Sequence, residues 1–109
     1  EMCKASNVSA HINFDKIKFL NGAFEMAQKN IIPGGSKRNL EYISKDIDFN
    51  ENIADFQKLM LADAQTSGGL LISCPSDRYE EFLKVLSWDV DAFCIGKIIN
   101  KKDTTISVD

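Results

Sequence analysis

The 109-residue chain has few cysteines, no Cys-x-x-Cys pair and a single histidine. Three widely spaced cysteines argue against a disulfide scaffold and favour a reducing cytosol. We expect Cys74 and Cys94, which lie in apolar runs, to be buried small hydrophobes, and Cys3 is the candidate for an exposed thiol. No suitably spaced ligands accompany His11, so a structural or solvent-facing strand histidine is a better interpretation than a metal ligand.

Long apolar runs and a basic excess are also missing. No stretch approaches the length of a membrane span, and no signal-peptide pattern opens the chain. The chain has 13 Lys and Arg and 16 Asp and Glu, which are evenly spread and give a net charge of −3. We therefore expect no membrane and no nucleic acid as partners, and a cytoplasmic location. The length and the 44% hydrophobic content fit one globular domain with a single core.

The first six residues read like the last turn of a helix and contain no initiator methionine. A chain that starts in the middle of a helix is expected to be a fragment. We therefore interpret residues 1–109 as one domain of a larger protein.

Strand and helix patterns alternate along the chain. Period-2 alternation or apolar runs predict strands at residues 8–14, 47–49, 70–74, 92–99 and 104–108. Helical spacing predicts helices at residues 22–29, 36–44, 53–60 and 76–86, with Ser36 and Ser76 as caps. We expect 70–74 to be covered on both faces and parallel to 92–99, with 104–108 returning as a hairpin partner. The predicted fold is a small α/β sandwich.

Two polar loops are the candidates for chemistry. In residues 33–39, two glycines precede a helix start, and Lys37 and Arg38 add positive charge, which favours binding of an anion. In residues 63–69, a carboxylate, an amide, two hydroxyls and a glycine pair precede a strand. The second loop is neither a P-loop nor a GxSxG elbow. The structural alternatives, a capped helix with solvated bases and a generic polar turn, remain open.

The combination of IPGGSKRN (residues 32–39) with ADAQTSGGLLI (residues 62–72) resembles the C-terminal part of the selenophosphate synthetase (selenide, water dikinase) family. Ser36 replaces the family's usual Thr, and Ala64 replaces a common Pro. The likeness extends over nearly the whole chain. It implies the α/β fold of the C-terminal domain of aminoimidazole ribonucleotide synthetase-like enzymes, with a mixed sheet and helices packed on it.

The resemblance also implies a function. Such enzymes make selenophosphate from selenide, ATP and water, releasing AMP and phosphate, and work as cytoplasmic homodimers. Their catalytic cysteine or selenocysteine, its lysine and the aspartates that hold magnesium and ATP belong to an N-terminal domain that has no counterpart here. We therefore expect the chain to lack catalytic residues, to be inactive alone and to bind neither ATP nor magnesium by itself.

On this resemblance the two loops line part of the active-site cleft and position phosphate or domain contacts. The expected substrate-binding residues are Gly34, Gly35, Arg38, Asn39, Gln65, Thr66 and Ser67, and the expected partners are the N-terminal domain and a second copy. A stand-alone binding or regulatory module with the same fold is the alternative. A related ATP-dependent synthetase is disfavoured because the second loop is typical of the selenium branch.

Overall fold

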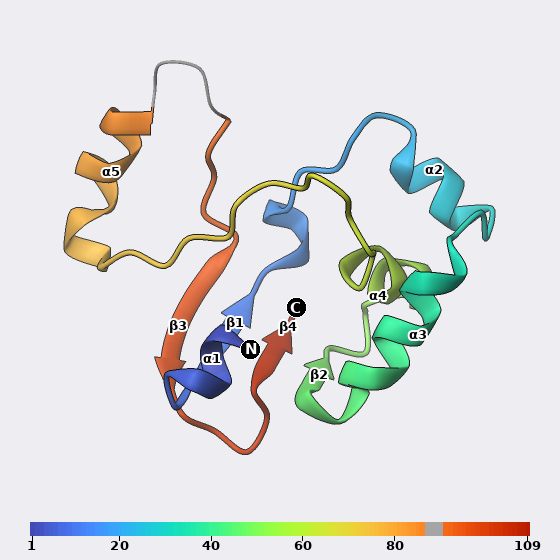
Figure 1. Ribbon diagram of the computed structural model, residues 1–109, viewed down its shortest axis with the longest axis horizontal. Coiled ribbons are helices and arrows are strands. Elements are labelled where there is room, and N and C mark those ends of the chain that lie inside the picture. The colour runs from blue at the N-terminus through green and yellow to red at the C-terminus, as the bar shows by residue number, and fades with distance from the viewer. Residues whose placement is uncertain (87–90) are drawn as a thin grey trace.

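The computed structural model describes residues 1–86 and 91–109 and contains a mixed four-stranded sheet with helices packed on it (Figure 1). The strands, in the spatial order β2-β4-β1-β3, are β1 (Val8–Ile12), β2 (Ile47–Phe49), β3 (Gly96–Asn100) and β4 (Ile106–Val108). The α-helices are α1 (Met2–Ala5), α2 (Ala23–Gln28), α3 (Gly34–Ile43), α4 (Asp55–Leu61) and α5 (Tyr79–Leu86). Short 3₁₀ turns are η1 (Phe14–Lys16), η2 (Ser44–Asp46) and η3 (Ser76–Arg78). The predicted α/β class is confirmed.

Strand β1 lies inside the sheet, pairing antiparallel with β3 and parallel with β4, while β4 also pairs parallel with β2. The alternation over residues 8–14 correctly predicts this strand, although Phe14 leaves it to begin η1. The predicted hairpin between 92–99 and 104–108 is wrong, because β1 is inserted between β3 and β4. The intervening residues 101–105 therefore connect two strands that are not neighbours.

One face of the sheet carries the core. Phe14, Ile53 and Val108 form the buried cluster. Partly buried apolar side chains from strands and helices pack against it, namely Ile12, Phe19, Phe24, Ile47, Phe49, Leu61 and Ile106. Helices α2 and α4 meet through an edge-to-face contact of the Phe24 and Phe56 rings, whose centroids are 5.1 Å apart. This packing buries the face predicted for α2 and confirms the helix predicted around residues 53–60.

The stretch 70–74 departs most from expectation. It forms no strand, and Leu70 and Leu71 are 90% and 66% exposed. The predicted parallel pair with 92–99 is therefore wrong, and β3 begins only at Gly96 and pairs with β1 instead. The helix predicted at 76–86 is present as η3 followed by α5, and its apolar face is half-buried rather than buried. In Figure 1, α5 stands apart from the sheet.

The cysteine predictions are reversed. Cys3 is buried, because α1 packs against β1, whereas Cys94 is exposed and Cys74 is half-buried in a segment outside the sheet. His11 does lie in a strand, where Nδ1 is 3.1 Å from Ser107 Oγ and Nε2 is 3.1 Å from Asp109 Oδ1. Within the described ranges, no helix is long and apolar enough to cross a membrane.

Candidate functional site

Helix α3 begins at Gly34, two residues earlier than predicted, with Pro33 as the N-cap. The predicted capping role of Ser36 is therefore wrong. Because α3 starts here, the backbone N–H groups of Gly34 and Gly35 have no partner within the helix. The N–H of Ser36 donates to the Pro33 carbonyl oxygen. The first turn of α3 thus presents two glycine amides at the positive end of the helix dipole.

The two polar segments predicted from the sequence lie side by side. Ser36 Oγ donates to Asp63 Oδ1 at 2.5 Å, joining the first turn of α3 to the beginning of the second loop. One turn farther along, Asn39 Nδ2 donates to the Ala62 carbonyl oxygen at 3.0 Å. A Cβ built on Gly35 would lie 3.7 Å from the Ala64 Cβ. The two hydrogen bonds join residues 27 and 23 positions apart in the sequence.

The second loop continues from this contact into solvent, with Gln65, Thr66 and Ser67 exposed. Ser67 has a φ of 56°, a left-handed conformation that turns the chain sharply. At Gly68, a Cβ would come within 2.5 Å of Gln65 Oε1 and 3.2 Å of Gln65 Cβ. The Gln65 side chain therefore folds over the Gly68 backbone.

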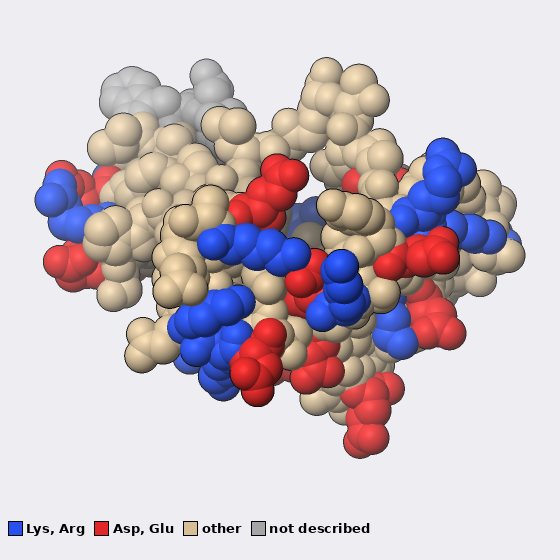
Figure 2. Space-filling model, turned by 60° about the horizontal axis from the view of Figure 1, so that its bottom comes forward, with Lys and Arg blue, Asp and Glu red and all other residues tan. Residues whose placement is uncertain are grey.

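Positive charge gathers at the start of α3. Lys37 and Arg38 are exposed, and a Cβ on Gly34 would be 3.6 Å from Arg38 Nη1, so the guanidinium lies beside the first turn. Asp63 brings a negative charge to the same place. On the face seen in Figure 2, Lys and Arg side chains are intermixed with Asp and Glu rather than segregated by sign.

The structure thus brings part of the predicted site together. Asn39 contacts the second segment, Gly35 lies near Ala64, Arg38 lies beside Gly34, and the exposed Gln65, Thr66 and Ser67 follow shortly after the contact. The sequence analysis missed the pairing of Ser36 with Asp63. Both residues stand in the quoted motifs, but a motif does not state which of its side chains meet.

The described residues, 1–86 and 91–109, contain no cluster of three or more His, Cys, Asp or Glu side chains that would hold a metal ion. Asp63 is thus the lone carboxylate of residues 62–69, and its Oδ1 accepts from Ser36. The candidate site offers amides, hydroxyls and cationic side chains, which suit an anionic group.

Comparison with known proteins identifies the family of the chain. Residues 1–109 match the family described as AIR synthase related protein, C-terminal domain. The chain is 42% identical over 110 residues to a selenide, water dikinase of Clostridioides difficile, covering 99% of this chain and 32% of that protein. It is 37% identical over 109 residues to the selenide, water dikinase of Aliarcobacter butzleri, covering 97% of this chain and 31% of the relative.

A third relative, the selenide, water dikinase of Pasteurella multocida, is 39% identical over 103 residues, which is 94% of this chain and 28% of that protein. The chain therefore spans about a third of the length of the curated relatives it matches. The resemblance to selenide, water dikinases inferred from the two motifs is confirmed. Because the family match covers every residue, the chain belongs to the family of AIR synthase related protein, C-terminal domain.

Proposed function

We propose that this chain is the C-terminal domain of a selenide, water dikinase that makes selenophosphate from selenide, ATP and water. The support is the similarity of nearly the whole chain to proteins of that name, at 37% and 42% identity. The catalytic cysteine or selenocysteine and the magnesium and ATP ligands then belong to the remaining two thirds of the protein. The domain alone is inactive under this proposal, and the intact enzyme is a cytoplasmic homodimer.

The role of the domain is to close one side of the active-site cleft. The observation that carries this proposal is the junction of the two motif segments, made by Ser36 with Asp63 and by Asn39 with Ala62. Under this proposal the amides of Gly34 and Gly35, the Arg38 guanidinium and the exposed side chains of the second loop face the same cleft.

The chemistry of this surface suits phosphate. Backbone N–H groups at a helix start favour negative charge, and a guanidinium donates two parallel hydrogen bonds to phosphate oxygens. The hydroxyls of Thr66 and Ser67 and the Gln65 amide add uncharged donors. Selenide activation itself takes place outside this chain, so the surface binds and orients a phosphate group and performs no covalent step.

The test is Arg38→Ala in the intact enzyme, with ATP consumption and selenophosphate yield as readouts. We expect the KM for ATP to rise about tenfold to a hundredfold, since a hydrogen bond to a charged group is worth about 1.5–3 kcal/mol. Lys29→Ala is the matched control, because Lys29 is an exposed cation just after α2 and outside both motif segments. Unchanged ATP turnover and selenophosphate yield in Arg38→Ala would remove this residue from any direct role.

A further inference from the structure

The contact between Ser36 and Asp63 joins a fully buried hydroxyl to the carboxylate of an exposed residue. Ser36 is 0% exposed, although it stands in the first turn of a surface helix. Its hydroxyl is 2.5 Å from Asp63 Oδ1, a length typical of a hydroxyl donating to an ionised carboxylate. A buried hydroxyl that lost this acceptor would be left unsatisfied, which is costly.

A second contact fixes the same junction. Helix α4 ends at Leu61, so the carbonyl of its C-cap, Ala62, has no partner within the helix. The Asn39 side-chain amide donates to that carbonyl. Ala62 is itself 6% exposed. The side chains of α3 thus hold the two residues at which the chain leaves α4 and enters the second loop.

The position of Asp63 is also favourable electrostatically. Its carboxylate lies against the first turn of α3, where the helix dipole stabilises negative charge. Asp63 is therefore engaged by the protein itself. Gln65, Thr66 and Ser67 follow within four residues, so the position of Asp63 sets where this segment begins.

We infer that Ser36 and Asp63 are positioning residues, which fix the base of the Gln65–Thr66–Ser67 loop at the start of α3 and do not touch substrate. Asn39 has the same role through Ala62 and is not a substrate ligand. This inference rests on the proposed function, because it assigns a task to the junction within the cleft. It removes Asn39 from the predicted binding residues and adds two residues that support them.

The test uses the intact enzyme with Asp63→Asn and Asp63→Ala. Asparagine keeps an oxygen that accepts from Ser36, whereas alanine removes the acceptor. A positioning role predicts that Asp63→Ala raises the KM for ATP roughly tenfold and that Asp63→Asn restores most of the loss. KM is informative because a merely destabilised enzyme has fewer active molecules but an unchanged KM. Equal losses in the two variants would show that the carboxylate charge acts directly, and would overturn the inference.

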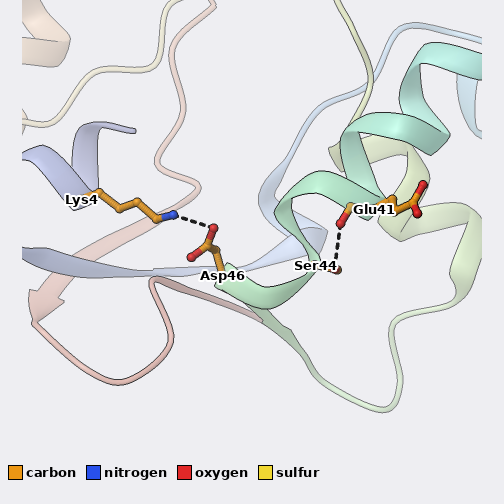
Figure 3. Close-up of polar contacts among 4 residues, drawn as sticks. All are labelled: Lys4, Glu41, Ser44 and Asp46. Carbon is orange, nitrogen blue, oxygen red and sulfur yellow. Dashed lines mark hydrogen bonds and ion pairs between the residues drawn. The ribbon is translucent and has the colours of Figure 1, made fainter.

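Ser36→Ala provides the reciprocal variant, with Ser44→Ala as the matched control in the same helix region. Ser44 Oγ donates to the Glu41 carbonyl oxygen at 2.8 Å in an exposed local contact (Figure 3). We expect hydrogen exchange at Ala62 and Asp63, whose amides donate to the Lys58 and Met60 carbonyl oxygens, to speed up at least severalfold in Ser36→Ala and to stay unchanged in Ser44→Ala. Unchanged exchange in Ser36→Ala would overturn the inference.

The outcomes separate this inference from the proposed function. If Arg38→Ala leaves turnover and yield unchanged while exchange at Ala62 and Asp63 responds to Ser36→Ala, the junction positions a loop that has no part in phosphate binding. If Ser36→Ala does not fold, the comparison of Asp63→Asn with Asp63→Ala decides, because both variants leave the buried Ser36 side chain in place.

Discussion

The backbone of Gly96 lies so close to the backbone of His11 that no side chain fits on Gly96. A Cβ built there would overlap the His11 carbonyl oxygen and come within 3.0 Å of Ile12 Cα. Gly96 is the first residue of β3 and is paired with Ile12, the last residue of β1. Glycine at this position therefore lets the edge strand approach β1.

We expect Gly96→Ala to lower the free energy of unfolding by about 1–3 kcal/mol, the usual cost of overpacking. The overlapping atoms are backbone and not the end of a flexible side chain, so the strand itself must shift. Urea denaturation followed by circular dichroism measures the change. Gly69→Ala is the control, because a Cβ there meets nothing within 4 Å, and its expected change is within about 0.5 kcal/mol. Equal stability of the two variants would contradict the prediction.

Local patterns in the sequence predicted those helices and strands whose apolar spacing follows from local backbone geometry. Alternation placed β1, and helical spacing placed α2 and α4, because the period of apolar residues is a direct consequence of strand and helix geometry. The predicted strand pairing was wrong, since β1 meets β3 and β4 across about 90 residues of sequence separation. The apolar residues in 70–74 and 104–108 indicate that a surface is to be buried, but they do not indicate which strand it pairs with.

The candidate site, too, was predicted only in part. The glycine pair at 34–35 and the polar loop at 63–69 stand out in the sequence, because their backbone and side-chain chemistry is unusual for connecting segments. The Ser36 hydroxyl was assigned to the local backbone, which is the common role of serine before a helix. The structure gives it to Asp63 instead, because α3 begins two residues earlier and turns Ser36 toward the end of α4. Only the tertiary fold supplies that acceptor.

An ion pair connects α1 to the turn before β2. Lys4 Nζ is 2.6 Å from Asp46 Oδ2, and the two side chains are 52% and 25% exposed (Figure 3). The hydrogen bond from Lys4 lowers the pKa of the Asp46 carboxyl, and the charges of Lys4, Lys45 and Lys101 act in the same direction. Because the folded pKa lies below the unfolded one, the stabilisation is complete above the unfolded value and is lost as pH falls through the folded value.

A double-mutant cycle with Lys4→Ala and Asp46→Asn is expected to show a favourable coupling at about pH 7 that disappears at about pH 2, where the carboxyl is protonated. The coupling is small and decreases with added salt, because both side chains reach solvent. Thermal unfolding at the two pH values measures it.

The ion pair of Asp55 and Lys58 within α4 is the control, because its two residues are close in the sequence. Its distance is 2.8 Å, and Lys58 likewise lowers the pKa of Asp55 through a hydrogen bond. This pair acts within one helix turn, whereas Lys4 and Asp46 are 42 residues apart. We expect hydrogen exchange at α1 to respond to Asp46→Asn and not to Asp55→Asn. A coupling for Lys4 and Asp46 that persists at low pH would contradict the assignment.

The exposed leucines of the segment after the second loop give a direct test of the departure from the predicted fold. If residues 70–74 were a strand covered on both faces, replacing Leu70 and Leu71 by serine would cost about 2–5 kcal/mol at each position. The two side chains are 90% and 66% exposed. We therefore expect the free energy of unfolding of the double variant of the 109-residue chain to lie within about 1 kcal/mol of that of the unchanged chain.

The control for this comparison is Ile53→Ser, which removes a side chain that is 7% exposed and belongs to the core with Phe14 and Val108. We expect that single change to cost more than the two leucine changes together, because it opens a cavity and leaves a hydroxyl among apolar atoms. Urea denaturation of the three chains gives the ranking. A double leucine variant less stable than Ile53→Ser would mean that 70–74 is packed in solution as the sequence pattern predicts.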